Sequence, residues 1–376
     1  MFRLITKNLT TIQTKNPRNP TPPIPNSSSI AFYLIDSFGL SPEKAFAAVK
    51  KLNCRCKLDI KSDKIKARLD PNAVPSFFVS NGFTKDQISK IIIKFPRILL
   101  CRPNRTLKPK IDFFLGAGFS RSDLARLMSD DVEILQASLN KRIIPVFDFL
   151  KTILYSDKEV IAALKQAPRL LHYHAEKRIS PNVETLRGFG MPEHRIYTLS
   201  KARARILVCE TDRFRRSIER VRDLGFKVSD YSFVVALQCV SWLSAATWER
   251  KVVALKSFGL SEDQILLVFK KEPAVMIISE DKLKRNMSFF VSRVNWSPEY
   301  VVLEPRLLGF SLERRLLPRT LTCEVLLSKG LISDKAFNHR VFLMNESRFF
   351  EKYVMRYQEE HPQVLEVYQA ALKQQH

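Results

Sequence analysis

The heptapeptide KFPRILL, Lys94 to Leu100, decides the fold of this chain because it places a proline inside an apolar run. Similar stretches recur as QAPRLLH (Gln166 to His172), LEPRLLG (Leu303 to Gly309) and, more loosely, KEPAVMI (Lys271 to Ile277). A residue that precedes proline avoids the α conformation, whereas proline itself suits the first turn of a helix. Each stretch therefore predicts a sharp corner, at which one helix ends and a short apolar helix begins.

The corners follow a regular spacing. Their prolines lie one, two or three periods of roughly 32 to 36 residues apart, which is typical of stacked repeats. Helix starts with capping-box spacing repeat in the same phase, at Thr84, Ser120, Ser156 and Ser261, with Ser-Pro starts at Ser41 and Ser297. Glycines suited to left-handed helix ends precede several starts: Gly39, Gly82, Gly118, Gly190, Gly225 and Gly259.

Each repeat is therefore predicted to contain a capped first helix, a short proline-led turn of helix and a longer second helix. About eight units begin near residues 41, 84, 120, 156, 192, 228, 261 and 297. Three corners lack proline, near Val132, Ala204 and Cys239 or Val240, and there we expect packing alone to hold the corner. The predicted fold class is an all-α superhelical solenoid over residues 30–376, with a polar and aromatic C-terminal cap at about 317–376.

The composition supports helices and an anionic partner. The 376 residues include only 10 glycines, and 45% of them are hydrophobic. Lys and Arg number 62 against 38 Asp and Glu, a net charge of +24. Such a surplus indicates a polyanion such as nucleic acid, although charge alone would also fit an ordinary basic organellar protein.

Other classes of function find little support. The six Cys form no CxxC pair, and His172 and His174 have no further metal ligand at a suitable spacing. No phosphate-binding loop or nucleophile constellation occurs, and the apolar run from Val234 to Ala246 is too short to cross a bilayer. We therefore expect a monomeric protein that is not an enzyme, with no cofactor, no metal and no membrane partner.

The first 29 residues differ from the rest. No acidic residue precedes Asp36, and basic residues alternate with apolar ones on a helical period, as in an organelle transit peptide. The segment NPRNPTPPIPNSSS, Asn16 to Ser29, is predicted to be a disordered linker. We expect a mitochondrial location, with the chloroplast as the alternative; an ordinary disordered tail is the other interpretation.

The PRILL and PRLL corners, the GF-[ST]xx[DEQ] helix starts and the ending LLPRTLTCEVLLSKGLI…FFEKYVMRYQEEHPQVLEVYQ resemble the mitochondrial transcription termination factors (mTERF), particularly the plant branch. The resemblance covers roughly Ile35 to Gln369. It implies a half-ring solenoid with a basic concave face that binds double-stranded DNA or, in some members, RNA. It also implies control of organellar gene expression, through transcription including termination, or through RNA processing such as intron splicing.

A basic group recurs near the start of the second helix of most units. Equivalent positions of stacked repeats share a face, so we expect these cations to follow a phosphate backbone. The candidates are Lys108, Lys110, Lys141, Arg142, Lys177, Arg178, Arg215, Arg216, Arg250, Lys251, Lys284, Arg285, Arg314 and Arg315. Arg203 and Arg205 join them from a dense basic patch in which acids are expected to form salt bridges, and Arg97, Arg169 and Arg306 follow the corners.

Alternatives to this interpretation remain. The basic groups also fit a solvated helix face, and the corner arginines could pair with an acid of a neighbouring repeat. A protein-binding scaffold solenoid and a base-per-repeat RNA code like that of pentatricopeptide proteins are the other functions considered. The proline corner disfavours the second. The 26 phenylalanines recur at apolar helical positions, and none of them can be nominated from the sequence as a base-stacking group.

Overall fold

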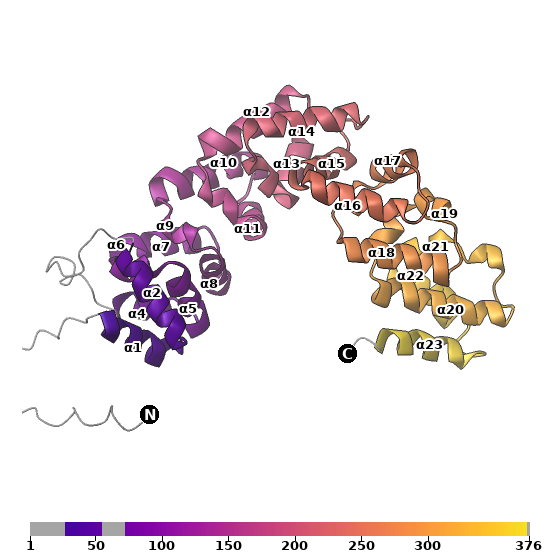
Figure 1. The fold of residues 1–376 in the computed structure, drawn as a ribbon, viewed down its shortest axis with the longest axis horizontal. Helices are drawn as coiled ribbons and strands as arrows, with labels where there is room; N and C mark the ends of the chain where they lie inside the picture. Colours follow the sequence, from indigo (N-terminus) through magenta and orange to yellow (C-terminus); the bar gives the residue numbers. More distant parts are fainter. Residues whose placement is uncertain (1–26, 55–71, 374–376) are drawn as a thin grey trace, which may run out of the picture. The chain divides into compact units, whose positions relative to one another are not determined.

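The computed structural model describes residues 27–54 and 72–373, and every regular element within them is helical (Figure 1). The all-α prediction is confirmed. The predicted transit peptide lies outside the described residues, but helix α1 begins at Ser27, inside the predicted linker. The chain divides into two compact units, with the boundary between Leu139 and Asn140, and each is described by itself.

The first unit contains the first repeats. Its elements are α1 (Ser27–Phe38), α2 (Pro42–Cys54), α4 (Ala73–Ser80), α5 (Lys85–Lys94), η1 (Pro96–Leu100), α6 (Pro103–Thr106), α7 (Lys108–Gly116), α8 (Arg121–Asp130) and α9 (Glu133–Gln136). Here α5, η1 and α7 form one complete repeat, and α5 packs against α8, the first helix of the next. The polar link predicted between η1 and α7 contains a short helix of its own, α6.

The second unit continues the pattern. Its first helices, its corner turns and its second helices form three sets of equivalent elements, which we call strips. First helices are α11 (Asp157–Gln166), α13 (Glu193–Ala202), α15 (Tyr231–Trp242), α17 (Glu262–Lys271) and α19 (Pro298–Leu303). Corner turns are η3 (Pro168–His172), η5 (Ala204–Val208), η6 (Pro273–Met276) and η8 (Pro305–Gly309). Second helices are α10 (Ile144–Leu154), α12 (Ser180–Gly188), α14 (Thr211–Asp223), α16 (Ala245–Lys256), α18 (Glu280–Ser288) and α20 (Leu317–Ser328).

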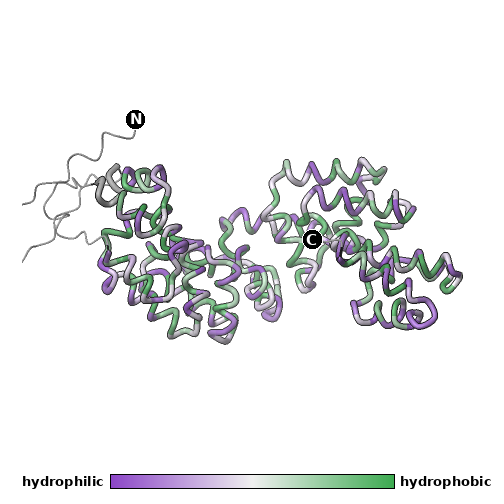
Figure 2. Tube along the Cα trace, turned by 90° about the horizontal axis from the view of Figure 1, so that it is seen from below, coloured by the Kyte–Doolittle hydropathy of each residue, from purple (hydrophilic) through white to green (hydrophobic). Residues whose placement is uncertain are grey.

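Within each strip, an element packs against the equivalent element of a neighbouring repeat. First helices contact first helices from α11 to α19, η3 contacts η5, η6 contacts η8, and α12 contacts α14 as α16 contacts α18. Hydrophobic and hydrophilic residues alternate at short intervals along the trace, as amphipathic helices require (Figure 2). The repeat architecture predicted from the corners is therefore present.

The predicted helix starts and ends are confirmed. Thr84 and Ser261 form complete capping boxes, because the residue three positions later is Gln and its side chain returns to the cap backbone. At Ser120 the carboxylate of Asp123 instead accepts the serine hydroxyl. All six predicted glycines have φ between 63° and 105°, and before α11 an exposed tyrosine, Tyr155, takes their place at φ 62°.

The corner residues leave the helix at a similar φ with or without a following proline. Phe95, Ala167 and Glu304 precede proline at φ near −135° and leave the helix. Asp131 and Arg203 make the same bend at φ −124° and −141°, although no proline follows them. Packing therefore does hold two of the three degenerate corners, as expected.

The third degenerate corner does not exist, which corrects the prediction. Helix α15 continues through Cys239 and Val240 and ends only at Trp242. No proline removes a backbone donor there, and every residue from Phe233 to Cys239 is buried, so the helix is enclosed on all sides. The Cys239 thiol donates to the carbonyl oxygen of Pro273 at 3.2 Å, in the corner of the following repeat.

The chain ends in elements that do not follow the repeat. They are η10 (Asp334–Ala336), α21 (His339–Leu343), α22 (Glu346–Phe350), η11 (Glu351–Met355) and α23 (Pro362–Lys373). Together with α20 they enclose a separate hydrophobic cluster that includes Cys323, Phe349 and Tyr368. None of the helices within the described ranges is long and apolar enough to span a membrane.

Candidate nucleic-acid interface

One position of the second helix faces the next repeat and is buried. Its occupants, one repeat apart, are Lys110, Val146, Asn182, Ser217, Lys251, Asn286 and Arg319. Five of these side chains donate hydrogen bonds to backbone carbonyl oxygens at the end of the next corner turn; Val146 cannot, and Ser217 bonds to its own helix. We call this position the staple position.

The staple side chains supply hydrogen-bond donors to carbonyl oxygens that the corner turns leave without a partner. The end of a short helical turn leaves carbonyl oxygens without an intrahelical partner, and burial excludes water from them. Asn182 Nδ2 lies 2.9 Å from the carbonyl oxygen of Leu207 and 2.8 Å from that of Cys209. Lys110 Nζ donates to Leu135 and Lys251 Nζ to Ile278, with only 8% and 3% of these lysines exposed.

A second inward position lies one helical turn earlier. Arg178 approaches the carbonyl oxygen of Cys209 at 3.5 Å, and Arg213 donates to that of Ser241 at 3.0 Å. Lys282 donates to Gly309 at 2.6 Å, and Arg315 donates to Phe342 at 2.8 Å. These cations also support the next repeat.

This geometry corrects the predicted row of phosphate ligands in two ways. Lys110 and Lys251 are buried staples, so they cannot contact phosphate in this structure, whereas Arg178 and Arg315 are half-buried donors to the next repeat and stay predictions. The basic pairs also occupy two registers one turn apart rather than a single phase: Lys177 and Arg178 lie before the helix proper, whereas Lys284 and Arg285 lie within it.

Burial also affects the charge of these cations. Loss of solvent lowers the pKa of Lys110 to about 8, because its ammonium group has carbonyl oxygens but no carboxylate beside it. The same cause lowers the pKa of Lys251 and of Arg315. A phosphate ligand needs an exposed group, so burial is the reason to assign Lys110 and Lys251 to the scaffold.

Three basic pairs lie in π turns that the sequence analysis did not foresee. The turns are η2 (Leu139–Ile143), η4 (Ala175–Ile179) and η9 (Leu312–Leu316), which carry Lys141 and Arg142, Lys177 and Arg178, and Arg314 and Arg315. In each, a proline follows four residues after the first cation, at Pro145, Pro181 or Pro318. Proline cannot bond to the carbonyl four residues back, so the turn widens. The sequence pattern basic-basic-apolar-x-Pro could have been used to predict these π turns.

The exposed cations fall into two groups. Lys177, Arg215, Arg216 and Arg314 are exposed and form no ion pair with any described acid. Others are paired: Lys108 with Asp112 at 2.6 Å, Arg250 and Lys284 with Glu280 at 3.5 and 2.7 Å, and Arg285 with Glu313 at 4.0 Å. Exposed pairs contribute little to stability and can give way to a phosphate. Lys141 is exposed, and Arg142 is half-buried with its Nε unpartnered.

The corner cations also divide. Arg97 and Arg169 are exposed without an acidic partner among the described residues, while Arg306 pairs with Glu304 at 2.6 Å. Glu304 raises the pKa of Arg306. Arg203 is half-buried and approaches the Tyr231 hydroxyl at 3.5 Å, and the guanidinium of Arg205 lies 5.2 Å from the centre of the Trp242 ring.

The dense basic patch on α14 is not neutralised as expected. Glu210, Asp212 and Glu219 form no ion pair within 4.0 Å, so the predicted salt bridges are absent from this described helix. Glu210 instead caps α14, accepting from the backbone N–H groups of Asp212 and Arg213. These hydrogen bonds lower the pKa of Glu210, which holds its charge at the positive helix end.

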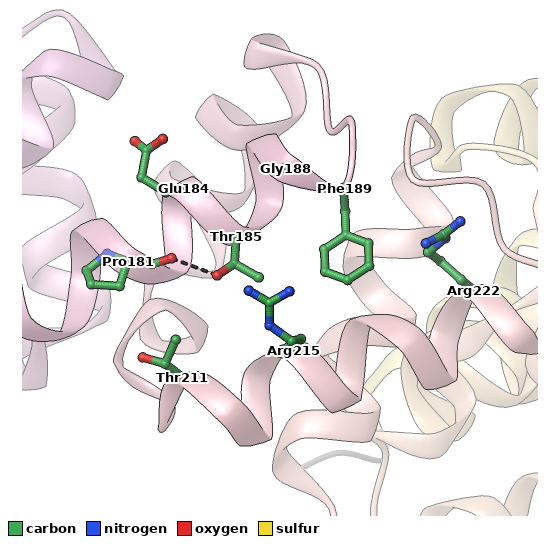
Figure 3. A pocket seen from close by; sticks show the side chains of 8 residues that line it. All are labelled: Pro181, Glu184, Thr185, Gly188, Phe189, Thr211, Arg215 and Arg222. Atoms are coloured by element: carbon green, nitrogen blue, oxygen red, sulfur yellow. Dashed lines mark hydrogen bonds between the residues drawn. The ribbon is translucent and has the colours of Figure 1, made fainter.

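A shallow groove of about 700 Å³ runs between α12 and α14 (Figure 3). It is lined by Pro181, Glu184, Thr185, Gly188, Phe189, Thr211, Arg215 and Arg222. The guanidinium groups of Arg215 and Arg222 lie 5.9 and 5.4 Å from the Phe189 ring centre, on either side of it in Figure 3. The groove places two unpaired cations along one edge, so it suits successive phosphates.

A repeat solenoid that exposes unpaired cations beside a shallow groove has the features of a nucleic-acid-binding scaffold. The mTERF family model matches residues 76–239 and 235–350, so the chain belongs to the mTERF family. Proteins of this family are organellar, helical nucleic-acid-binding repeat proteins with roles related to transcription, and they are not typically enzymes. No curated protein matches the chain.

Proposed function

We propose that this protein binds double-stranded DNA in an organelle, as a member of the plant branch of its family, and regulates transcription there, including termination. The observation that carries the proposal is the division of the second-helix cations into two sets. One set is buried against carbonyl oxygens and holds the repeats together. The other, with Lys177, Arg215 and Arg216 at its centre, is exposed and forms no ion pair with a described acid, so its charge is available to a ligand.

The location follows from the family and from the predicted transit peptide. The basic, acid-free start of the sequence favours the mitochondrion, with the chloroplast as the alternative. Fusion of residues 1–29 to a fluorescent protein tests this directly. Mitochondrial accumulation supports the proposal, and accumulation in the cytosol contradicts it.

The binding proposal is tested by charge reversal. We expect Lys177→Glu, Arg215→Glu and Arg216→Glu together to abolish duplex binding and to leave helical circular dichroism unchanged. Each lost phosphate contact lowers the slope of log affinity against log salt by about 0.9. The matched control reverses three exposed lysines outside the second helices, Lys158, Lys227 and Lys270, and alters the net charge equally.

The possible outcomes distinguish the functional classes. Loss of binding in the first triple variant alone supports a specific interface on the second helices. Equal loss in both variants indicates attraction by net charge only, and unchanged binding in both overturns the interface. Failure of the unaltered protein to bind duplex DNA or RNA favours the protein-scaffold alternative, and tighter binding to RNA favours a role in RNA processing.

A further inference from the structure

The repeat of α15 exposes an aromatic residue at a position where the other described corners bury an aliphatic one. Two residues after the corner position, these corners place Ile98, Ile134, Leu170, Ile206, Val275 or Leu307, all 1% exposed or less. In the α15 repeat this position holds Trp242, and 39% of it is exposed. The helix replaces the corner turn there, so the indole does not enter the core.

The exposed indole has a cationic neighbour from the preceding repeat. The guanidinium of Arg205 lies 5.2 Å from the Trp242 ring centre, within cation–π range. Arg205 is itself exposed and has no acidic partner among the described residues. One repeat earlier, Arg169 occupies the same place on η3, which packs against η5, so two unpaired guanidinium groups precede the indole along the corner strip.

Unpartnered polar atoms gather in the same elements. Ser200 Oγ on α13, Arg203 Nε at its end, and Gln238 Oε1 and Ser241 Oγ on α15 are buried without a hydrogen-bond partner. Buried polar groups without partners reduce stability, so each calls for an explanation. Figure 1 shows α13 and α15 beside each other, and the two helices are in contact, so these atoms lie on neighbouring elements of the repeat whose corner α15 replaces.

We infer that Trp242 and Arg205 form a stacking site for an unpaired nucleobase of a single-stranded nucleic acid, with Arg169 contacting its phosphate backbone. The site rests on the proposed nucleic-acid function and extends it to single strands. The guanidinium of Arg205 lies over the Trp242 ring, so an incoming base would stack on the opposite face of the indole or on the guanidinium plane, and the positive charge attracts the adjoining phosphate. RNA and a displaced DNA strand share this chemistry.

The test uses the full chain and labelled 12-nucleotide single strands of RNA and DNA, with a DNA duplex as the third probe. Trp242→Ala should weaken single-strand binding by about 5- to 100-fold, the range of stacking on one aromatic residue. Trp242→Phe, which keeps an aromatic face, should retain most of the affinity. Tyr155→Ala removes another exposed aromatic ring, 70% exposed on the α10–α11 turn, and should change nothing.

The outcomes distinguish this site from the proposed duplex interface. Loss on both single strands supports stacking regardless of the sugar, and loss on RNA alone supports it and identifies RNA as the ligand. Unchanged single-strand binding by Trp242→Ala, or equal loss with Trp242→Phe, overturns the site. Duplex binding should not respond to Trp242 and should respond to the Lys177, Arg215 and Arg216 reversal, so either proposal can fail without the other.

Discussion

The side-chain amide of Asn286 donates to the carbonyl oxygen of Leu308 at 2.9 Å, from the second helix of one repeat into the corner turn of the next. The same amide reaches the carbonyl oxygen of Phe310 at 2.9 Å, and Asn182 makes the equivalent pair of bonds in an earlier repeat. A single buried side chain thus satisfies two acceptors, of which one hydrogen bond is buried and the other is part-buried. This relationship explains why the stack tolerates a polar residue in its interior.

Replacing this amide should destabilise the protein. Asn286→Ala leaves the buried carbonyl oxygen of Leu308 and the part-buried one of Phe310 without this donor, and we expect a loss of about 1–3 kcal/mol in the free energy of unfolding. Ser217→Ala is the matched control, since Ser217 occupies the same position but donates only to Arg213 of its own helix, at 2.9 Å. It should cost about 1 kcal/mol or less in urea unfolding. Equal effects of the two substitutions would refute the staple.

Lys110 should make stability depend on alkaline pH. Its pKa is about 8 in the folded chain against an ordinary value of 10.5, so between these values the unfolded chain binds a proton that the folded chain lacks. Stability from this group therefore rises as the pH increases from about 8 to 10.5, and its penalty is fully present below 8.

Urea unfolding of the wild type and of Lys110→Met between pH 7 and pH 10 measures this effect. Both should carry Cys101→Ala, because the Cys101 thiol interacts with Lys110 and burial raises the pKa of this thiol. The wild type should gain stability relative to the variant as the pH rises. A difference that stays constant, or that changes in the opposite direction, would show that the ammonium group is solvated.

Proline should improve one corner that lacks it. Val132 has φ −69°, which proline prefers, and the preceding Asp131 already has the extended conformation that proline imposes. Val132→Pro should therefore stabilise the folded chain by about 0.4–1 kcal/mol by restricting the unfolded chain. Thermal unfolding measures the gain, with Val132→Ala as the control. A lower melting temperature for the proline variant would mean that the Val132 N–H is needed.

Two adjacent arginines should give opposite results. Arg314 is exposed and unpaired, so Arg314→Ala should weaken duplex binding and change stability by no more than about 0.5 kcal/mol. Arg315 donates to the carbonyl oxygens of Phe342 and Met344, so Arg315→Ala should cost about 1.5–3 kcal/mol of stability. Binding titrations and urea unfolding on both variants check this. Reversed results would assign Arg315, and not Arg314, to the interface.

The sequence was sufficient for the repeat and for most of its helix starts and corners, although not for the corner predicted near Cys239, because caps, glycines and prolines act locally. The capping residues Thr84 and Ser261 and the corner at Pro96 needed no tertiary information. The direction in which a cation points was not predictable, because it depends on the neighbouring repeat. Lys108 and Lys110 are two residues apart, yet one is exposed beside Asp112 and the other is buried against Leu135.

The exposure of the Trp242 indole was also not predictable from the sequence. Trp242 belongs to an apolar run, and such a run predicts burial. Only the continuation of α15 beyond Cys239, where other repeats turn, leaves this residue at the surface. A missing proline was visible in the sequence, but its consequence depends on the enclosure of that helix by its neighbours.

The staples also give the molecule a direction. Every staple donor precedes its acceptor along the chain, from Lys110 to Leu135 and from Arg319 to Met344. During synthesis, which proceeds from the N-terminus, each emerging corner therefore meets a repeat whose donor has already been made. A chain shortened from the C-terminus loses carbonyl acceptors, and the donor side chains that remain can be solvated by water. A chain shortened from the N-terminus loses donors, and the carbonyl oxygens that remain have no partner. During synthesis on the ribosome, the repeats should therefore fold in order from the N-terminus, and each new repeat should pack against the one made before it.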